Sequence, residues 1–292
     1  ANDGTVFMTG ETPHATGNLS GDSALHNLVI GAPRFQNDGI TWTAQTAADD
    51  DDYWHSVTYG NGLFVAVGNS GDRVMTSPDG ITWTARSAAG DNDSWFGVTY
   101  GDGLFVAVGN ASEGADAVMT SPDGITWTVR SAAGDDDWWS SVTYGNGLFV
   151  AVGTTQSATL NAVMTSPDGI TWTARSAADD DDTWTSVTYG NRLFVAVGFA
   201  LGSDAVMTSP DGITWTVRSA AGNDDIWTSV TYGNGLFVAV GAPGFTPGTD
   251  AVMTSPDGIT WTARSAASDS DEWVGVMYGG GLFVAIGQID DH

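Results

Sequence analysis

The sequence predicts an all-β protein, a six-bladed β-propeller of four-stranded antiparallel blades, because one unit recurs along the chain. A Gly-Leu-Phe-Val-Ala-Val-Gly segment, slightly altered in two copies, supplies Phe64, Phe105, Phe149, Phe194, Phe237 and Phe283. An Ile-Thr-Trp-Thr segment recurs with the same spacings and supplies Trp42, Trp83, Trp127, Trp172, Trp215 and Trp261. The remaining seven tryptophans precede a Val-Thr-Tyr-Gly or Val-Met-Tyr-Gly segment. A period of roughly 40–45 residues is typical of one propeller blade.

Each unit is expected to hold four short strands, as the unit that begins at Trp184 illustrates. Trp184 to Tyr189 alternates in polarity, and Leu193 to Val197 is a continuous apolar run suited to a strand buried on both faces. Ala205 to Ser209 and Ile213 to Arg218 supply the third and fourth strands. Tight turns containing Asn-Gly and Ser-Pro-Asp-Gly join strands one and two and strands three and four, which predicts consecutive hairpins.

The two ends of the chain are expected to share the sixth blade. Residues 273–287 supply strands one and two of a last unit, and residues 27–46 supply strands three and four as Asn27 to Gly31 and Ile40 to Gln45. This two-plus-two strand clasp between the N- and C-termini would close the ring and remove its open edges.

The clasp predicts a propeller over residues 27–292 that is preceded by an N-terminal arm or extra strand over residues 1–26. Within that segment, Gly4 to Gly10 weakly resembles strand two. Three roles stay open for it: an added edge strand, a competitor for the sixth blade, or an arm that reaches a neighbour.

The turn between strands three and four reads Ser-Pro-Asp-Gly-Ile-Thr-Trp in five copies, and the first copy is degraded to Gln36-Asn37-Asp38-Gly39. It resembles the Asp-box of sialidase-like, bacterial-neuraminidase-repeat propellers, Ser-x-Asp-x-Gly-x-Thr-Trp, with one residue deleted before the glycine. Through its repeats the resemblance covers nearly the whole chain. It implies a structural role in the turn for Asp79, Asp123, Asp168, Asp211 and Asp257.

The charge of the chain excludes some partners and suggests an environment. Its net charge is -27, and all eight basic residues are arginine. Such a surface repels nucleic acid and anionic lipid, so neither nucleic-acid binding nor membrane insertion is expected. At about 1 M salt the Debye length falls to roughly 3 Å, so the self-repulsion would largely vanish. The Asp-rich, Lys-free composition therefore indicates a high-salt environment.

Clusters of aspartate are expected in the links between blades. Clustered carboxylates suit hard cations such as Ca²⁺, which take 6–8 oxygen ligands, although the spacing matches no defined calcium motif. The alternative is a solvated acidic surface with no cofactor. The candidate metal ligands are Asp49, Asp50, Asp51, Asp52, Asp135, Asp136, Asp137, Asp179, Asp180, Asp181 and Asp182.

The residue pattern leads us to expect no catalytic residues and no enzymatic activity. A sialidase needs three converging arginines, whereas the repeated arginines here fall in the outermost strand of each blade. No aspartate stands in an apolar setting that would raise its pKa for acid catalysis. The four histidines show no metal-ligand spacing. The arginines in question are Arg86, Arg130, Arg175, Arg218 and Arg264.

The two edges of each blade differ in sequence variation. The turns after strands one and three are nearly identical between copies, whereas the loops after strands two and four vary. Because variable loops on a rigid scaffold are common sites of recognition, we expect a non-catalytic display or attachment module on a virion or cell surface. Its partner would be a protein in a larger assembly, reached through residues 1–26. The alternatives are a lectin that binds a surface glycan and a sialidase-like glycoside hydrolase.

Overall fold

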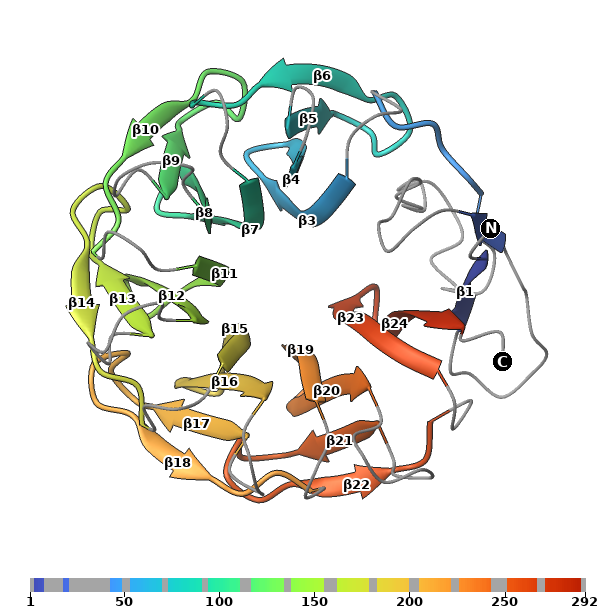
Figure 1. Cartoon of the computed structure of the whole chain (residues 1–292), viewed down its shortest axis with the longest axis vertical. Helices are drawn as coiled ribbons and strands as arrows, with labels where there is room; N and C mark the ends of the chain where they lie inside the picture. Colours follow the sequence, from blue (N-terminus) through green and yellow to red (C-terminus); the bar gives the residue numbers. More distant parts are fainter. Residues whose placement is uncertain are drawn as a thin grey trace. The chain divides into compact units, whose positions relative to one another are not determined.

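The regular structure of the chain is entirely β-strand in the part that the structure describes. This computed structural model describes residues 3–7, 18–20, 43–48, 53–69, 73–90, 94–110, 117–133, 138–154, 162–178, 183–199, 205–221, 226–242, 251–266 and 271–289. Its strands form six four-stranded sheets in which neighbouring strands are antiparallel (Figure 1). The predicted all-β class with repeated four-stranded blades is confirmed. Among the described residues, no helix has the length and apolar character needed to cross a membrane.

Five of the sheets follow chain order, with strands one to four side by side. The first contains β3 (Tyr53–Gly60), β4 (Leu63–Asn69), β5 (Arg73–Ser77) and β6 (Thr84–Ser87). The second contains β7 (Ser94–Gly101), β8 (Leu104–Asn110), β9 (Val118–Ser121) and β10 (Thr128–Arg130). The third contains β11 (Trp138–Gly145), β12 (Leu148–Thr154), β13 (Val163–Ser166) and β14 (Thr173–Arg175). The fourth contains β15 (Thr183–Gly190), β16 (Leu193–Phe199), β17 (Val206–Ser209) and β18 (Thr216–Arg218). The fifth contains β19 (Ile226–Gly233), β20 (Leu236–Ala242), β21 (Val252–Ser255) and β22 (Thr262–Arg264).

The sixth sheet joins strands from the two ends of the chain in the order β2-β1-β24-β23. Its strands are β1 (Asp3–Phe7), β2 (Asn18–Ser20), β23 (Asp271–Gly279) and β24 (Leu282–Ile289). The strand beside β24 is therefore β1, where the sequence led us to expect Asn27 to Gly31. Of the expected partners, residues 27–42 lie outside the described residues, and residues 43–45 form no strand.

The register explains why β1 fits beside β24. Val6 and Phe7 stand opposite Ile286 and Ala285. In the second sheet, Val118 and Met119 of strand three stand opposite Val108 and Ala107 of strand two in the same way. The segment around Val6 thus matches the apolar pattern of a third strand, and it takes that position.

The chain falls into two compact units, each of which contains three sheets. Unit 1 is Ala1–Ser20, Asp38–Thr41 and Ser176–His292, and it holds the fourth, fifth and sixth sheets. Unit 2 is Gly21–Asn37 and Trp42–Arg175, and it holds the first, second and third sheets.

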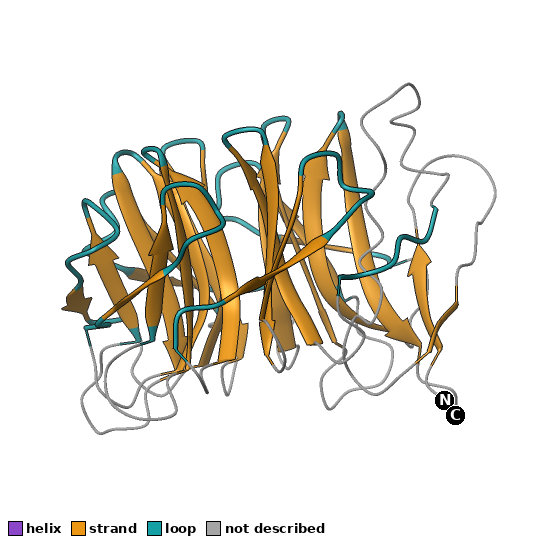
Figure 2. Ribbon diagram, turned by 90° about the horizontal axis from the view of Figure 1, so that it is seen from above, coloured by secondary structure: helices purple, strands orange, loops and turns teal. Residues whose placement is uncertain are grey.

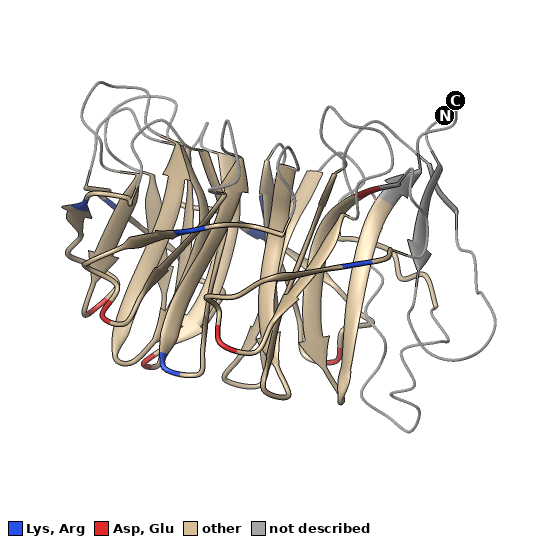
Figure 3. Ribbon diagram, turned by 90° about the horizontal axis from the view of Figure 1, so that it is seen from below, with Lys and Arg blue, Asp and Glu red and all other residues tan. Residues whose placement is uncertain are grey.

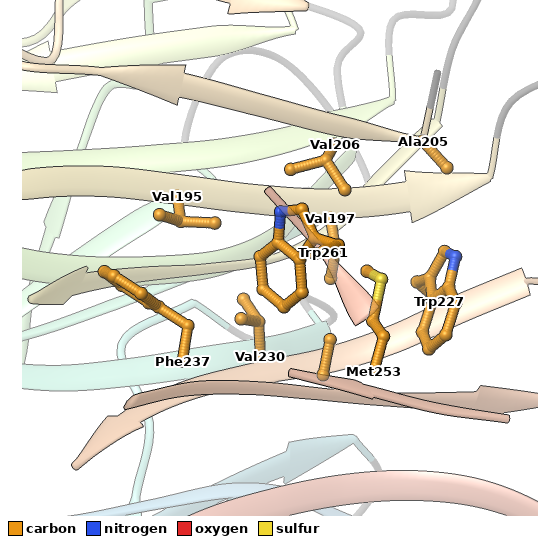
Figure 4. Packing of buried hydrophobic residues seen from close by; sticks show 10 residues of the cluster. Val195, Val197, Ala205, Val206, Trp227, Val230, Phe237, Met253 and Trp261 are labelled. Carbon is orange, nitrogen blue, oxygen red and sulfur yellow. The ribbon is translucent and has the colours of Figure 1, made fainter. Parts of the chain in front are cut away.

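Within each unit the core lies between consecutive sheets and centres on the tryptophan of strand one. In unit 1, Trp227 is fully buried against Val197 and Val206 of the preceding sheet (Figure 4). In unit 2, Trp95 packs against Val67 and Val74 in the same way. Strand two takes part in this packing from both sides of the core: Val195 and Val197 of β16 pack against the following sheet, and Phe237 and Ala239 of β20 pack against the preceding one. Burial of one such large apolar side chain stabilises the fold by roughly 1.5–3 kcal/mol.

Candidate functional site

The turn between strands three and four is held by one serine and one aspartate. In the fourth sheet, Asp211 Oδ1 accepts the backbone N–H groups of Ile213 at 2.9 Å and Thr214 at 2.8 Å. Ser209 Oγ donates to Asp211 Oδ1 at 2.9 Å and accepts the N–H of Gly212 at 2.8 Å. Gly212 has a φ of 73°, which a side chain would strain. The structure places Asp79, Asp123, Asp168 and Asp257 in the same role in their own turns.

The backbone N–H groups of this turn keep its carboxylate ionised. The pKa of Asp211 lies below its ordinary value, chiefly because the N–H of Thr214 donates to it, followed by that of Ile213. The pKa of Asp79 is lowered by the equivalent groups of Thr82 and Ile81. These aspartates are therefore committed to the turn as hydrogen-bond acceptors.

The repeated arginines lie in strand four, which is an edge strand of each sheet (Figure 3). Arg218 Nε donates to Thr208 Oγ1 of the neighbouring strand at 3.1 Å. Arg86, Arg130 and Arg175 form the same bond at 3.1 Å, and Arg264 forms it at 2.9 Å. In these five sheets the guanidinium group is thus positioned along the edge strand by a threonine.

The candidate cation ligands of the sequence fall in segments 49–52, 135–137 and 179–182, which lie outside the described residues. Among the described residues, no group of three or more His, Cys, Asp and Glu side chains is arranged to hold a metal ion. A Ca²⁺ site in the acidic segments therefore stays a prediction.

The sequence-variable segments begin and end at one edge of each sheet. The Asn-Gly and Ser-Pro-Asp-Gly turns lie at the opposite edge, where Figure 2 shows short turns in teal. Strand two ends and strand three begins at the variable edge, as do the end of strand four and the start of the next strand one, because all neighbours are antiparallel. We call this the variable edge, and it is defined by the strand ends that flank segments 70–72, 111–116, 155–161, 200–204 and 243–250.

Two residues at the variable edge of unit 2 depart from the repeat, and our sequence reasoning missed them. His55 and Phe96 follow the tryptophan of strand one in the first and second sheets, where Ser140, Thr185 and Thr228 stand in later sheets. Their ring centroids are 5.0 Å apart and the rings meet edge to face. The sequence signal that could have revealed them is the absence of a serine or threonine at the position directly after the tryptophan of strand one.

Burial lowers the pKa of His55 below its ordinary value, and the side chain of Asn69 opposes this by raising it. The Asn69 side chain acts on the imidazole through a hydrogen bond, and its Oδ1 atom is buried from solvent. His55, Asn69 and Phe96 thus bring a titratable group, a buried amide and an aromatic ring together in the first two sheets.

Among the described residues, the tryptophan side chains expose little surface on which a sugar could stack. Trp95, Trp184 and Trp227 are fully buried, whereas Trp138, the local doubling in the third sheet, is 49% exposed. Stacking of a sugar ring needs an exposed aromatic face, so Trp138 is the described indole that offers one. A glycan ligand stays a prediction.

Comparison with known proteins shows the fold. No protein-family model and no curated protein sequence matches the chain. Virginiamycin B lyase from Staphylococcus aureus has a similar structure, with a TM-score of 0.72 at 11% identity over 98% of this chain and 94% of that chain. A catalytically inactive variant of that enzyme with quinupristin has a TM-score of 0.73 at 10% identity, over 99% of this chain and 95% of that chain. YCF48 bound to D1 peptide has a TM-score of 0.59 at 14% identity, over 86% of this chain and 82% of that chain.

These comparisons correct the expectation that the chain is not an enzyme. Virginiamycin B lyase is an enzyme with a similar structure, so the lack of a sialidase-like arrangement of arginines does not argue against catalysis. At 10–14% identity the likeness shows the fold alone and assigns no reaction to this chain. The sialidase-like assignment stays a prediction. The repeated four-stranded sheets and the solved structures together show that this chain is a β-propeller.

Proposed function

We propose that this propeller binds a protein partner through its variable edge and serves as a display or attachment module on a virion or cell surface. The observation that carries the proposal is the contrast between the two edges. The bond from a threonine N–H to the turn aspartate recurs in five turns with distances of 2.8–2.9 Å, as for Asp123 Oδ1 with Thr126 and Asp211 Oδ1 with Thr214. All large differences in segment length fall at the variable edge.

A rigid scaffold with one variable edge is suited to recognition, because the scaffold holds the loops in place while their sequences change freely. The likeness to YCF48, which is bound to a peptide in its solved structure, supports a protein ligand for this fold. The net charge of -27 favours a high-salt setting and a partner with a basic surface.

The finer prediction for the fold, a ring of six blades that closes, is part of this proposal. It is supported by the six four-stranded sheets and by the participation of strands from both ends of the chain in the sixth. We propose that closure gives the module a continuous variable edge. Small-angle scattering that fits two separate three-bladed bodies and not a ring would contradict it.

Cross-linking through carboxylates tests the proposed function, because the chain has 35 acidic residues and no lysine. The protein is cross-linked with a dihydrazide reagent in its native assembly, and the linked peptides are identified by mass spectrometry. We expect links to one partner from the acidic segments beside the variable edge, such as 49–52 and 179–182. Links that come mainly from the turn aspartates, or an absence of partner links, would overturn the proposal.

A further inference from the structure

The pair of residues that begins strand one and ends strand two at the variable edge differs in each of the five sheets that follow chain order. We call it the rim pair. The next pair, one step away from the variable edge, is a tryptophan and a glycine in all five sheets, as for Trp139 and Gly153. Variation therefore begins at the rim pair, on strands that are still hydrogen-bonded. The five rim pairs are Tyr53 with Asn69, Ser94 with Asn110, Trp138 with Thr154, Thr183 with Phe199 and Ile226 with Ala242.

The rim pair of the third sheet contains an indole that the core does not use. The core position of β11 is filled by Trp139, which is 1% exposed and packs against Val106 and Val108 of the preceding sheet. Successive side chains of a strand point to opposite faces, so Trp138 points away from this core. Its side chain is 49% exposed, whereas the rim residues at the start of strand one in the other four sheets are half-buried.

The main chain beneath this indole is held in place. Trp138 pairs with Thr154 in the register of β11 and β12. A Cβ atom on Gly153 would collide with the carbonyl oxygen of Trp138, so the glycine lets the two strands approach. The N–H of Gly153 donates to Ala162 O at 3.1 Å, which ties the same place to the start of strand three. An aromatic side chain on a fixed backbone loses little conformational freedom on binding, which is one reason why tryptophan often dominates binding energy.

The chemistry of the rim pairs indicates the kind of partner that they fit. None of the ten residues is charged, although the chain has a net charge of -27. Uncharged side chains are removed from water at a lower cost than carboxylates. The indole of Trp138 would bury its apolar surface in an apolar pocket, and basic side chains around that pocket would complement the acidic chain. A sugar site needs several fixed polar groups beside the ring, and this rim pair offers the one hydroxyl group of Thr154.

We propose that Trp138 is the anchor residue of the variable edge: it inserts into an apolar pocket of the protein partner, and basic side chains of the partner surround that pocket. The inference rests on the proposed function and names the residue on which binding chiefly depends. Segment 155–161 follows Thr154 directly in the sequence, so the anchor stands beside the end of one of the variable segments.

The test measures the affinity of the full-length protein for the partner that dihydrazide cross-linking identifies, purified and deglycosylated. Trp138→Thr installs the residue that the fourth sheet has at this position, and Ile226→Thr is the matched control, which places the same residue in the rim pair of the fifth sheet. Thermal unfolding confirms that both variants fold. In the wild type, hydroxyl-radical footprinting with mass spectrometry compares the oxidation of Trp138 with and without the partner.

We expect Trp138→Thr to weaken binding by about tenfold or more, and Ile226→Thr by less than about twofold. The loss in Trp138→Thr should be the same at about 0.1 and 2 M KCl, because salt does not screen an apolar contact. The partner should also protect Trp138 of the wild type from oxidation.

Unchanged affinity in Trp138→Thr, together with full oxidation of Trp138 in the complex, would overturn the inference. An equal loss in Ile226→Thr would also overturn it, because binding would then not depend chiefly on one rim residue. Loss of binding on deglycosylation would show a glycan ligand in place of a protein pocket. If the anchor failed while exchange of segment 155–161 or 243–250 still weakened binding, the proposed function would stand.

Discussion

The ring of Tyr144 lies over Gly101 of the preceding sheet so closely that a Cβ atom on Gly101 would stand 2.1 Å from Tyr144 Cγ. Tyr100 covers Gly60 at the same distance, and Tyr232 covers Gly190. Each tyrosine also contacts the phenylalanine of its own strand two, as in the pair Tyr144 and Phe149 with ring centroids 4.6 Å apart. The glycine that ends strand one thus allows the next sheet to approach.

This contact predicts that Gly101→Ala destabilises the protein by about 3 kcal/mol, because the added methyl group meets the stem of the ring and not a flexible end. Urea unfolding of the variant measures the loss. In a Tyr144→Ala background the same change should cost under about 1 kcal/mol, since the ring is gone. An equal loss of unfolding free energy in both backgrounds would show that Gly101 is needed for its backbone conformation and not for the contact with Tyr144.

The turn aspartates predict a loss of stability in acid. Because the N–H groups of Thr214 and Ile213 lower the pKa of Asp211 in the folded chain, its contribution is fully present above the unfolded pKa near 4. It is lost as the pH falls through the lower folded pKa. Unfolding of the wild type and Asp211→Asn between pH 6 and pH 2 should give a difference that shrinks below pH 4, and a difference independent of pH would contradict this.

His55 predicts a second pH dependence at a higher pH. Its pKa is lowered in the folded chain, so the folded state disfavours the proton and its contribution is present above pH 6.5. That contribution is lost as the pH falls through the folded pKa. The stability of the wild type should therefore decrease between pH 7 and pH 5 by more than that of His55→Thr. Parallel curves would show that the imidazole titrates as it does in the unfolded chain.

The net charge of -27 predicts a strong response to salt. Screening of the self-repulsion should raise the unfolding temperature by roughly 10 °C between 0.1 and 2 M KCl. Scanning calorimetry measures the shift, with sucrose as a control for solute exclusion from the surface. An unfolding temperature that is the same at both salt concentrations would remove the case for a high-salt environment.

The strands and turns could be predicted from the sequence because each depends on a local signal. The run Leu193 to Val197 is apolar on both faces, and Ser209 with Asp211 forms a turn that needs no distant partner. The partner of β24 could not be predicted in this way. Two segments, around Val6 and in residues 27–45, carry patterns suited to the same position, and the sequence pattern does not show that the first of them pairs with β24.

The contact between His55 and Phe96 could not be predicted from the sequence for a related reason. His55 and Phe96 are 41 residues apart, and they meet because the same position of consecutive repeats lies side by side. The burial of Asn69 Oδ1 has no counterpart in the residue pattern. The inference against catalysis failed because it tested the chain only for the residue sets of familiar chemistries, such as converging arginines, and other propellers carry out other reactions.

The most direct test of the account is the affinity for the cross-linked partner after changes at the two edges. In two variants, segment 243–250 or segment 155–161 is replaced by residues 70–72, the three residues that join β4 and β5. A third variant, Ile213→Thr, changes a residue that is 45% exposed in the Ser-Pro-Asp-Gly turn at the opposite edge. We expect at least one segment exchange to weaken binding tenfold or more and Ile213→Thr to leave it unchanged. Unchanged binding in both exchanges, together with a loss in Ile213→Thr, would contradict recognition at the variable edge.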